Sequence, residues 1–114
     1  MHIQIINFGL KDISDEEFRK YCEAVAPAFA ALPGLVSKYW LADPETNAYG
    51  GVYVWRDRPA MEDYAKTDIY KGMLETPGFE DVTVKDFAVL EKPTRVTRGV
   101  DLTVQPRTTE RTTR

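Results

Sequence analysis

Three polar residues lie at positions where their side chains could take part in acid–base chemistry. Lys38 and Asp86 each lie next to aromatic residues, and His2 begins an apolar stretch. An ammonium can hold a developing anion, a carboxylate among apolar neighbours can move a proton, and an imidazole titrates near neutral pH. Each residue also has an ordinary alternative. Lys38 can extend from a strand edge to solvent, Asp86 can face solvent or pair with Lys38 or Lys85, and His2 can be a terminal strand residue. These three are our candidate catalytic residues.

Large side chains, mostly aromatic, are available to line an apolar pocket around those groups. The candidate substrate-binding residues are Asn7, Tyr39, Trp40, Tyr53, Trp55, Tyr64 and Phe87. Aromatic residues at strand spacing also form ordinary cores, and an asparagine at a strand end can simply complete a turn. Two glycines, Gly50 and Gly51, lie among these aromatics. Glycine weakens a strand interior, so the pair indicates a bulge or a group packed close to the backbone.

The elements that must position these residues follow the order strand, helix, strand, strand, helix, strand. Strands rich in branched and aromatic residues are predicted over 2–8, 35–41, 49–55 and 82–90. This order predicts an α+β fold of the ferredoxin-like β-α-β-β-α-β type, with an antiparallel sheet and helices on one face.

The helix boundaries carry recognisable signals. Ser14 and Glu17 have the spacing of a capping box, and Pro33-Gly34 ends the first helical segment. Pro27 is predicted to kink or interrupt that segment, because proline removes one backbone donor. The second helical segment begins after Asp57 and is predicted to be split at Thr67-Asp68.

Both faces of the predicted sheet are apolar. In the third strand Tyr53 and Trp55 alternate with Val52 and Val54, so one apolar set must turn away from the helices. An exposed apolar sheet face of this size marks an interface. The sequence therefore predicts a homodimer in which the two sheets pair.

Length and composition favour one small domain. The 114 residues fit a single core, which we place at residues 1–92. Residues 93–114 are rich in threonine and arginine and form a predicted tail, disordered except for an alternating segment at 100–104 that can cross onto a neighbouring molecule as a short strand.

Charge and cysteine content exclude several classes of partner. The net charge of −3 gives no electrostatic reason to expect nucleic acid or an anionic membrane as partner, and no apolar run is long enough to span a bilayer. Cys22 is the only cysteine and His2 the only histidine, so no disulfide and no set of metal ligands is expected. These features favour a cytoplasmic protein without a metal.

The hairpin region resembles a known family. The similarity lies in Pro33-Gly34-Leu35, Lys38, Trp40-Leu41, the Asp43-Pro44 turn, and Gly50–Tyr53 followed by Trp55. In these residues the hairpin region resembles the YdhR-type monooxygenases. That group belongs to the dimeric α+β barrel superfamily, together with the antibiotic-biosynthesis monooxygenases. The resemblance covers about the first 92 residues, the length of one small domain.

The resemblance implies a homodimer with a small-molecule cavity between sheet and helices in each subunit. It also implies a monooxygenase of secondary metabolism that oxidises a small aromatic or polyketide-like substrate with molecular oxygen and no cofactor. Fold alone does not determine function, so other readings stay open. A non-oxidative isomerase or cyclase would use the same pocket, and a small-molecule-binding dimer without catalysis is also compatible.

RNA recognition is a further alternative, because RNA-recognition modules share this order of elements. The segment Gly50–Trp55 lacks the basic residue of their signature, and the net charge is negative. We therefore expect no nucleic-acid partner.

Overall fold

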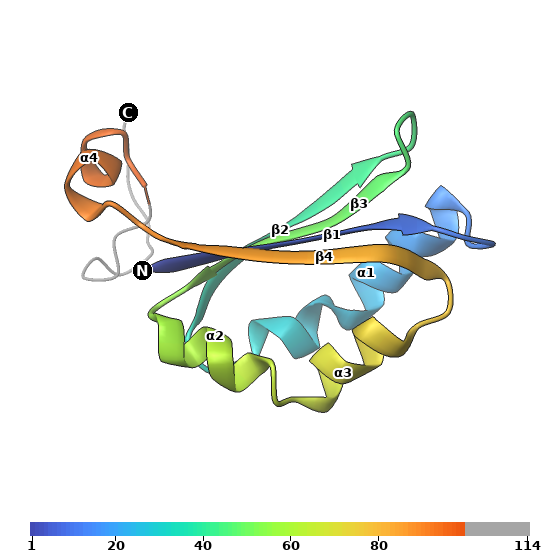
Figure 1. Ribbon diagram of the computed structural model, residues 1–114, viewed down its shortest axis with the longest axis horizontal. Coiled ribbons are helices and arrows are strands. Elements are labelled where there is room, and N and C mark those ends of the chain that lie inside the picture. Colours follow the sequence, from blue (N-terminus) through green and yellow to red (C-terminus); the bar gives the residue numbers. More distant parts are fainter. Residues whose placement is uncertain (100–114) are drawn as a thin grey trace.

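A four-stranded antiparallel sheet forms the centre of the fold (Figure 1). The computed structural model describes residues 1–99. The strands are β1 (His2–Leu10), β2 (Leu35–Asp43), β3 (Ala48–Trp55) and β4 (Phe79–Ala88). Their order across the sheet is β2-β3-β1-β4, so β2 and β4 are the edge strands. The predicted α+β ferredoxin-like fold is confirmed.

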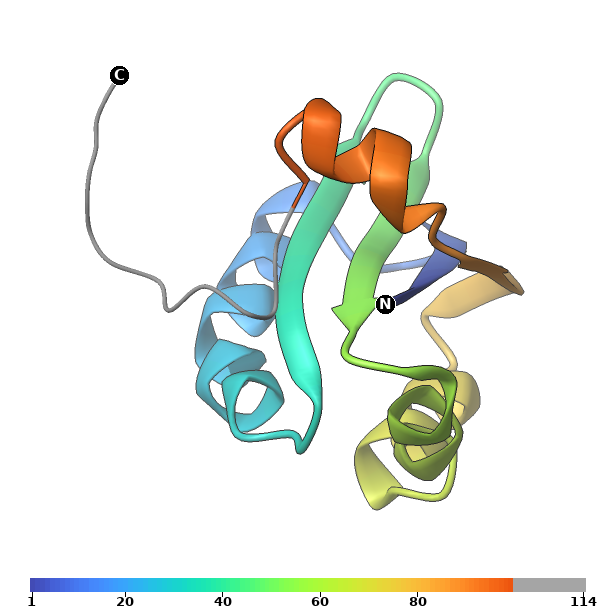
Figure 2. The same cartoon turned by 90° about the vertical axis from the view of Figure 1, so that its left-hand side faces the viewer.

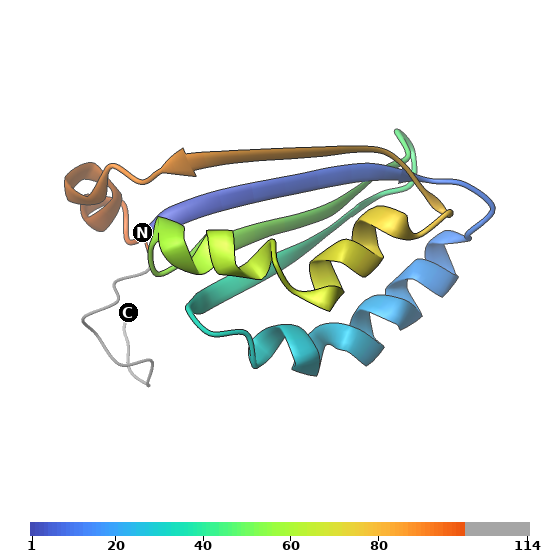
Figure 3. The same cartoon turned by 60° about the horizontal axis from the view of Figure 1, so that its bottom comes forward.

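The helices α1 (Asp15–Ala30), α2 (Arg58–Tyr64) and α3 (Asp68–Glu75) cover one face of this sheet (Figure 3). The last helix of the described residues is α4 (Glu91–Val96). The short α4 follows β4 and lies beyond the end of the sheet, on the side of the N-terminus (Figures 1 and 2). The opposite sheet face carries none of the helices α1 to α3.

Local capping explains where the helices begin. The Ser14 hydroxyl accepts a hydrogen bond from the backbone N–H of Glu17, and the Glu17 carboxylate accepts one from the N–H of Ser14. Asp57 caps α2 and Thr67 caps α3, which confirms the predicted split of the second helical segment. Each such cap is worth about 1 kcal/mol of stability.

Several strand ends differ by one to three residues from the sequence-based prediction, and two differences concern a proline and a turn. The interruption expected at Pro27 is wrong, since α1 continues through it to Ala30. Pro27 lies so close to the end of α1 that the loss of one backbone donor does not stop the last turn. The last strand begins at Phe79 rather than at residue 82, directly after the Pro77-Gly78 turn.

The part of the chain after β4 adds an element that the sequence did not predict. Helix α4 spans residues 91–96 and therefore crosses the boundary that we placed between 92 and 93. The segment 100–104, predicted as a strand, lies outside the described residues.

The strand register decides which side chains meet the helices. Tyr53 and Trp55 on β3 pair with Gln4 and His2 on β1, and all four are buried on the helix side. The core there contains aromatic rings from β1, β3, β4, α1 and α2 together with aliphatic side chains, and Trp55 in it has no exposed surface.

The opposite face, which we call the open face, is apolar as predicted. Its residues include Ile3, Ile5, Tyr39, Val52, Val54 and Phe87. Tyr39 is 59% exposed and Phe87 is 54% exposed. The open face therefore presents large apolar side chains to solvent in the single chain.

The paired glycines serve close packing, one of the two reasons expected for them. A Cβ atom on Gly50 would lie 1.9 Å from the backbone oxygen of Ile6, and Gly50 has a φ of +145°. Only glycine allows β1 to approach β3 this closely.

Candidate active site

Lys38 points from the edge strand β2 into the space between sheet and helices. It pairs with Tyr53 in the β2–β3 ladder, which places it on the helix side of the sheet. The neighbouring Gly51 lies on the same side and leaves room for the lysine stem, because a Cβ atom there would be 2.9 Å from Lys38 Cε. Gly51 thus helps to fix the position of the amine.

Three aromatic rings surround the Lys38 amine. Its Nζ atom lies 3.3 Å from the ring centre of Trp40, 3.5 Å from that of Phe29 and 4.5 Å from that of Tyr53. Phe29 and Trp40 meet edge to face, with ring centres 5.2 Å apart. We call this arrangement the aromatic cage. Each ring face attracts a cation by about 0.5–2 kcal/mol.

The caged amine has no acidic partner among residues 1–99. No carboxylate oxygen of this part lies within 4.0 Å of Nζ, and none of its groups accepts a hydrogen bond from it. Burial without a counter-ion lowers the pKa of Lys38 to about 7, from the ordinary value of 10.5. The ring faces favour the ammonium form and so raise the pKa of Lys38, but they do not replace the hydration that the ammonium loses. The amine therefore changes its charge near neutral pH.

The other titratable groups around Lys38 stay neutral at that pH. Burial raises the pKa of Tyr53 far above its usual range and raises the pKa of Tyr64 to about 12. Their hydroxyl oxygens are 3.4 Å apart. On α1, burial also raises the pKa of Tyr21 and of the Cys22 thiol. Of these groups, only the Lys38 amine exchanges protons readily near pH 7.

Two neighbouring spaces adjoin the cage. The inner cavity, about 30 Å³, is lined by Phe8, Phe18, Tyr21, Phe29, Lys38, Trp40, Gly50, Tyr53, Met73 and Phe79. The outer pocket, about 320 Å³, lies between α1 and β2 and is lined by Phe18, Arg19, Cys22, Glu23, Ala26, Trp40, Leu41 and Ala42. Phe18 and Trp40 line both. The inner cavity holds about two water molecules, whereas the outer pocket has the volume of a small-molecule site.

The structure brings four of the candidate residues together. Lys38, Trp40 and Tyr53 line the inner cavity, and Tyr64 stands behind Tyr53 with ring centres 5.5 Å apart. Trp55 stacks on the far side of Tyr53 at 6.0 Å and donates a hydrogen bond to Gln4. Trp55 therefore supports the wall of the cavity and does not line it.

His2 and Asp86 form a separate pair. The Nε2 atom of His2 lies 2.7 Å from Oδ1 of Asp86, with the imidazole buried and the carboxylate partly exposed. Asp86 is on the edge strand β4, whereas Lys38 is on the opposite edge strand β2. Two strands lie between them, a separation of about 14 Å across the sheet. Asp86 therefore bonds to His2, and the alternative pairing with Lys38 is absent.

The three remaining candidates lie outside the cavity. Tyr39 and Phe87 belong to the open face, since they pair with Val52 and Ile3. Asn7 donates a hydrogen bond to the backbone oxygen of Tyr49. Each of these strands is apolar on both faces, so alternation in the sequence gave no basis for choosing a side.

Most of the residues that line the two spaces were not among the candidates. Phe29, Tyr21 and Met73 face the inner cavity, and Cys22 faces the outer pocket. Their helical spacing is that of an ordinary apolar stripe. No signal in the sequence distinguishes a ring that contacts Lys38 from one that fills the core.

No group of three metal-ligating side chains comes together within residues 1–99. In the same part of the chain, no helix is long and apolar enough to cross a membrane.

The chain is thus a ferredoxin-like α+β domain with two spaces between its sheet and its helices. The family described as "Putative mono-oxygenase ydhR" matches residues 3–100, and the chain belongs to this family. The match extends beyond the first 92 residues and includes α4. No curated protein matches the chain in sequence.

Solved structures share the fold at low sequence identity. SnoaB, a cofactor-independent oxygenase from Streptomyces nogalater, is 19% identical, with a TM-score of 0.63 over 80% of this chain and 95% of its own. The heme-degrader MhuD from Mycobacterium tuberculosis is 17% identical, with a TM-score of 0.64 over 79% of this chain and 96% of its own. At these identities the likeness shows the fold and not the reaction.

Proposed function

We propose that this chain is a cofactor-independent monooxygenase that oxidises a small phenolic substrate, with Lys38 as the catalytic base. The observation that carries the proposal is the partly buried Lys38 amine, caged by three rings and without an acidic partner in residues 1–99. A base with a pKa near the working pH is best suited to proton transfer. Membership of the monooxygenase family and the shared fold with the oxygenase SnoaB support the choice of reaction.

The chemistry begins with a proton transfer. The neutral Lys38 amine takes the proton of the phenol and becomes an ammonium, which then holds the phenolate as its counter-ion. The phenolate passes one electron to molecular oxygen, and the phenoxyl and superoxide radicals combine into a peroxide anion at a ring C–H carbon. The Lys38 ammonium then returns its proton to this anion, which gives the hydroperoxide and restores the neutral amine. Loss of water gives the quinone, so one oxygen atom enters the product and the other leaves as water. The ammonium stabilises the anionic states in a site shielded from solvent.

The substrate ring needs more room than the inner cavity offers. The outer pocket has about 320 Å³ and shares Trp40 with the cage. We place the ring in the outer pocket, with its hydroxyl group directed past Trp40 toward Lys38. A displaced Trp40 would change its fluorescence when substrate binds.

The open face supports a homodimer. Tyr39 and Phe87 are more than half exposed there, and a hollow of about 510 Å³ lies between this face and α4, lined in part by Ile3, Ile5 and Pro93. A second copy that presents the same face would bury these side chains, since a two-fold interface is self-complementary. The dimer is part of the proposal.

The test is oxygen uptake by the purified protein with a panel of naphthols and hydroxyanthracenes, under air and under nitrogen. We expect oxygen consumption and quinone formation under air alone, and a loss of at least 100-fold in kcat/KM for Lys38→Met. That loss corresponds to about 2.7 kcal/mol of transition-state stabilisation. Lys66→Arg, on the exposed surface, is the matched control and should keep full activity.

Product formed equally under nitrogen would overturn the oxygenase and identify an isomerase or cyclase that uses the same base. Binding without turnover under either gas would identify a non-catalytic carrier. Full activity of Lys38→Met would remove Lys38 from the mechanism.

A further inference from the structure

We propose that Lys38 is also a covalent binding site for small carbonyl compounds, which its amine captures as an imine in the aromatic cage. The inference uses the same residue as the proposed function but requires neither oxygen nor a phenol. It adds a second ligand class, the smallest aldehydes, such as acetaldehyde.

The geometry leaves the amine available for this reaction. Nζ packs against the rings of Phe29 and Trp40 at 3.5 and 3.3 Å, and apolar contacts replace the ion pair that a lysine usually makes. No group in residues 1–99 forms a hydrogen bond or an ion pair with the Lys38 amine. A desolvated lysine in an apolar pocket is the arrangement that activates amines toward carbonyl carbons.

The reaction balances within the site. The neutral amine attacks the carbonyl carbon, a C–N bond forms, and the C=O π bond becomes a hydroxyl group. The nitrogen then loses its second proton and the hydroxyl group leaves as water, which creates the C=N bond. No electron is transferred and no co-reactant is needed. The apolar cage favours the loss of water and hinders its return.

The surroundings of the amine do not compete with it. Cys22 and Tyr21 face this region from α1 and Tyr53 faces it from β3, and burial raises the pKa of each. The helix α3 contributes Met73, which does not titrate. Protonation of Lys38 itself therefore controls how the reaction depends on pH.

The size of the inner cavity selects the carbonyl compound. Its volume of about 30 Å³ corresponds to about two water molecules. Acetaldehyde leaves two non-hydrogen atoms on Nζ once water has departed, which matches this space, whereas benzaldehyde leaves seven and requires the rings to move apart. We therefore expect capture to be limited by size.

The experiment treats the intact protein anaerobically with acetaldehyde and cyanoborohydride at pH 7, followed by intact mass and peptide mapping. Reduction fixes the imine as a secondary amine, so the mass rises by that of acetaldehyde less one oxygen atom. Near pH 7 about half of the Lys38 amines are neutral, against about one in three thousand for an exposed lysine. We expect Lys38 to react about 100- to 1000-fold faster than Lys66.

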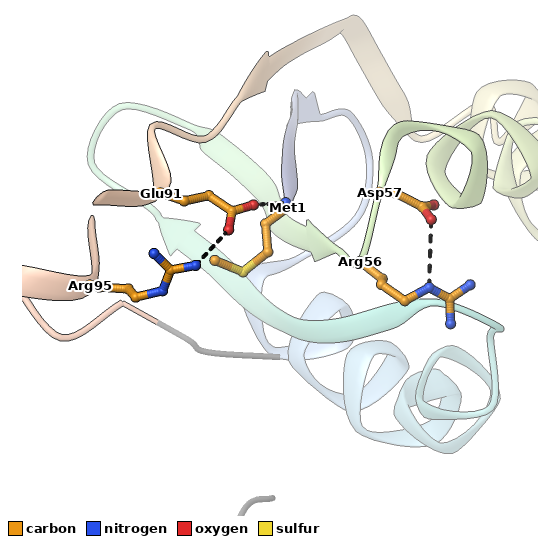
Figure 4. Close-up of polar contacts among 5 residues, drawn as sticks. All are labelled: Met1, Arg56, Asp57, Glu91 and Arg95. Atoms are coloured by element: carbon orange, nitrogen blue, oxygen red, sulfur yellow. Dashed lines mark hydrogen bonds and ion pairs between the residues drawn. The ribbon is translucent and has the colours of Figure 1, made fainter. Parts of the chain in front are cut away.

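The N-terminal amine is the internal control for selectivity. Free α-amino groups are the other amines that react with aldehydes near neutral pH. Here the Met1 amine lies 2.7 Å from the Glu91 carboxylate, which also contacts Arg95 at 3.2 Å (Figure 4). This ion pair slows attack by the Met1 amine, and peptide mapping separates its product from that of Lys38.

Labelling spread over the surface lysines, or concentrated on Met1, would overturn the proposal, as would labelling by benzaldehyde as fast as by acetaldehyde. Lys38→Met should abolish the main product and leave labelling at Lys66 and Met1 unchanged. The outcome is independent of the oxygenase assay. Imine capture without oxygen uptake refutes the oxygenase alone, and oxygen uptake without capture refutes the carbonyl site alone.

Discussion

Lys38 lies directly opposite Tyr53 in the β2–β3 ladder, and its amine is 4.5 Å from the centre of the tyrosine ring. Cross-strand partners have neighbouring Cβ atoms on one face of a sheet, so the lysine cannot leave this face without a change of register. The fold therefore holds a cationic group among aromatic rings from α1, β2 and β3. It does so at a cost in stability, because an ammonium without a counter-ion loses its hydration there.

Replacing Lys38 by methionine should stabilise the fold, most strongly at low pH. The folded state releases the Lys38 proton at a pKa of about 7, whereas the unfolded chain keeps it to about 10.5. Between these values the unfolded state binds more protons, so the wild-type free energy of unfolding rises with pH. Partial exposure and the ring contacts reduce the effect to about 2 kcal/mol.

Urea unfolding of wild type and Lys38→Met at pH 6 and pH 10 measures this difference. The variant should be more stable at pH 6, and the advantage should shrink at pH 10. An equal difference at both pH values would mean that the lysine is not desolvated in the folded state.

Gly51→Ala should displace the amine without unfolding the domain. The new Cβ atom would lie 2.9 Å from Lys38 Cε and 3.3 Å from the Tyr39 backbone oxygen. The flexible lysine stem can move, so we expect loss of rapid acetaldehyde labelling at Lys38 while the circular dichroism spectrum is retained. Gly72→Ala on α3, where no atom lies within 4 Å of the added Cβ, is the control. It should keep the labelling and raise stability by about 1 kcal/mol.

A charge on the open face should separate the proposed dimer. Phe87 is 54% exposed on this face, and Phe87→Glu would place a carboxylate between two apolar sheets. We expect the dissociation constant to rise about 100-fold or more, measured by sedimentation equilibrium. Leu74→Glu, at a 44% exposed position on α3, carries the same charge away from the open face and should stay dimeric. A monomeric wild type would contradict the proposed pairing.

Ser37→Ala should stabilise the chain. The Ser37 hydroxyl is buried and has no hydrogen-bond partner among residues 1–99, which costs about 1–3 kcal/mol. Ser14→Ala is the same chemical change at a helix cap and should destabilise by about 1 kcal/mol. Thermal unfolding compares the two variants. A loss of stability for Ser37→Ala would instead show that a second copy bonds this hydroxyl, because Ser37 pairs with Val54 on the open face.

The fold was predictable because its signals are local. The capping box at Ser14, the helix start after Asp57 and the break at Thr67-Asp68 depend on neighbouring residues, and the structure confirms them. Helix α4 was missed because it is only six residues long and contains Pro93, so its sequence alone does not favour a helix.

The site was predictable in part. Lys38 and Trp40 stood out by residue type, and they do line one cavity. Phe29 contacts the same amine but comes from a helix whose apolar stripe is ordinary. Tyr39 and Phe87 fall on the open face, and only the pairing of strands could show this, because both faces of their strands are apolar.

The aromatic cage comes from one uninterrupted stretch of the chain. Phe29, Trp40 and Tyr53 all lie within the α1–β2–β3 unit, which spans residues 15–55, whereas the His2–Asp86 pair joins the first and last strands. Mutations that accumulate in β1 and β4 during evolution can therefore alter the His2 end while the contacts of the Lys38 amine persist. A recombination event that exchanged residues 15–55 between relatives would transfer Lys38 together with its three ring contacts, whereas Phe8, Met73 and Phe79, which complete the inner cavity, would come from the recipient.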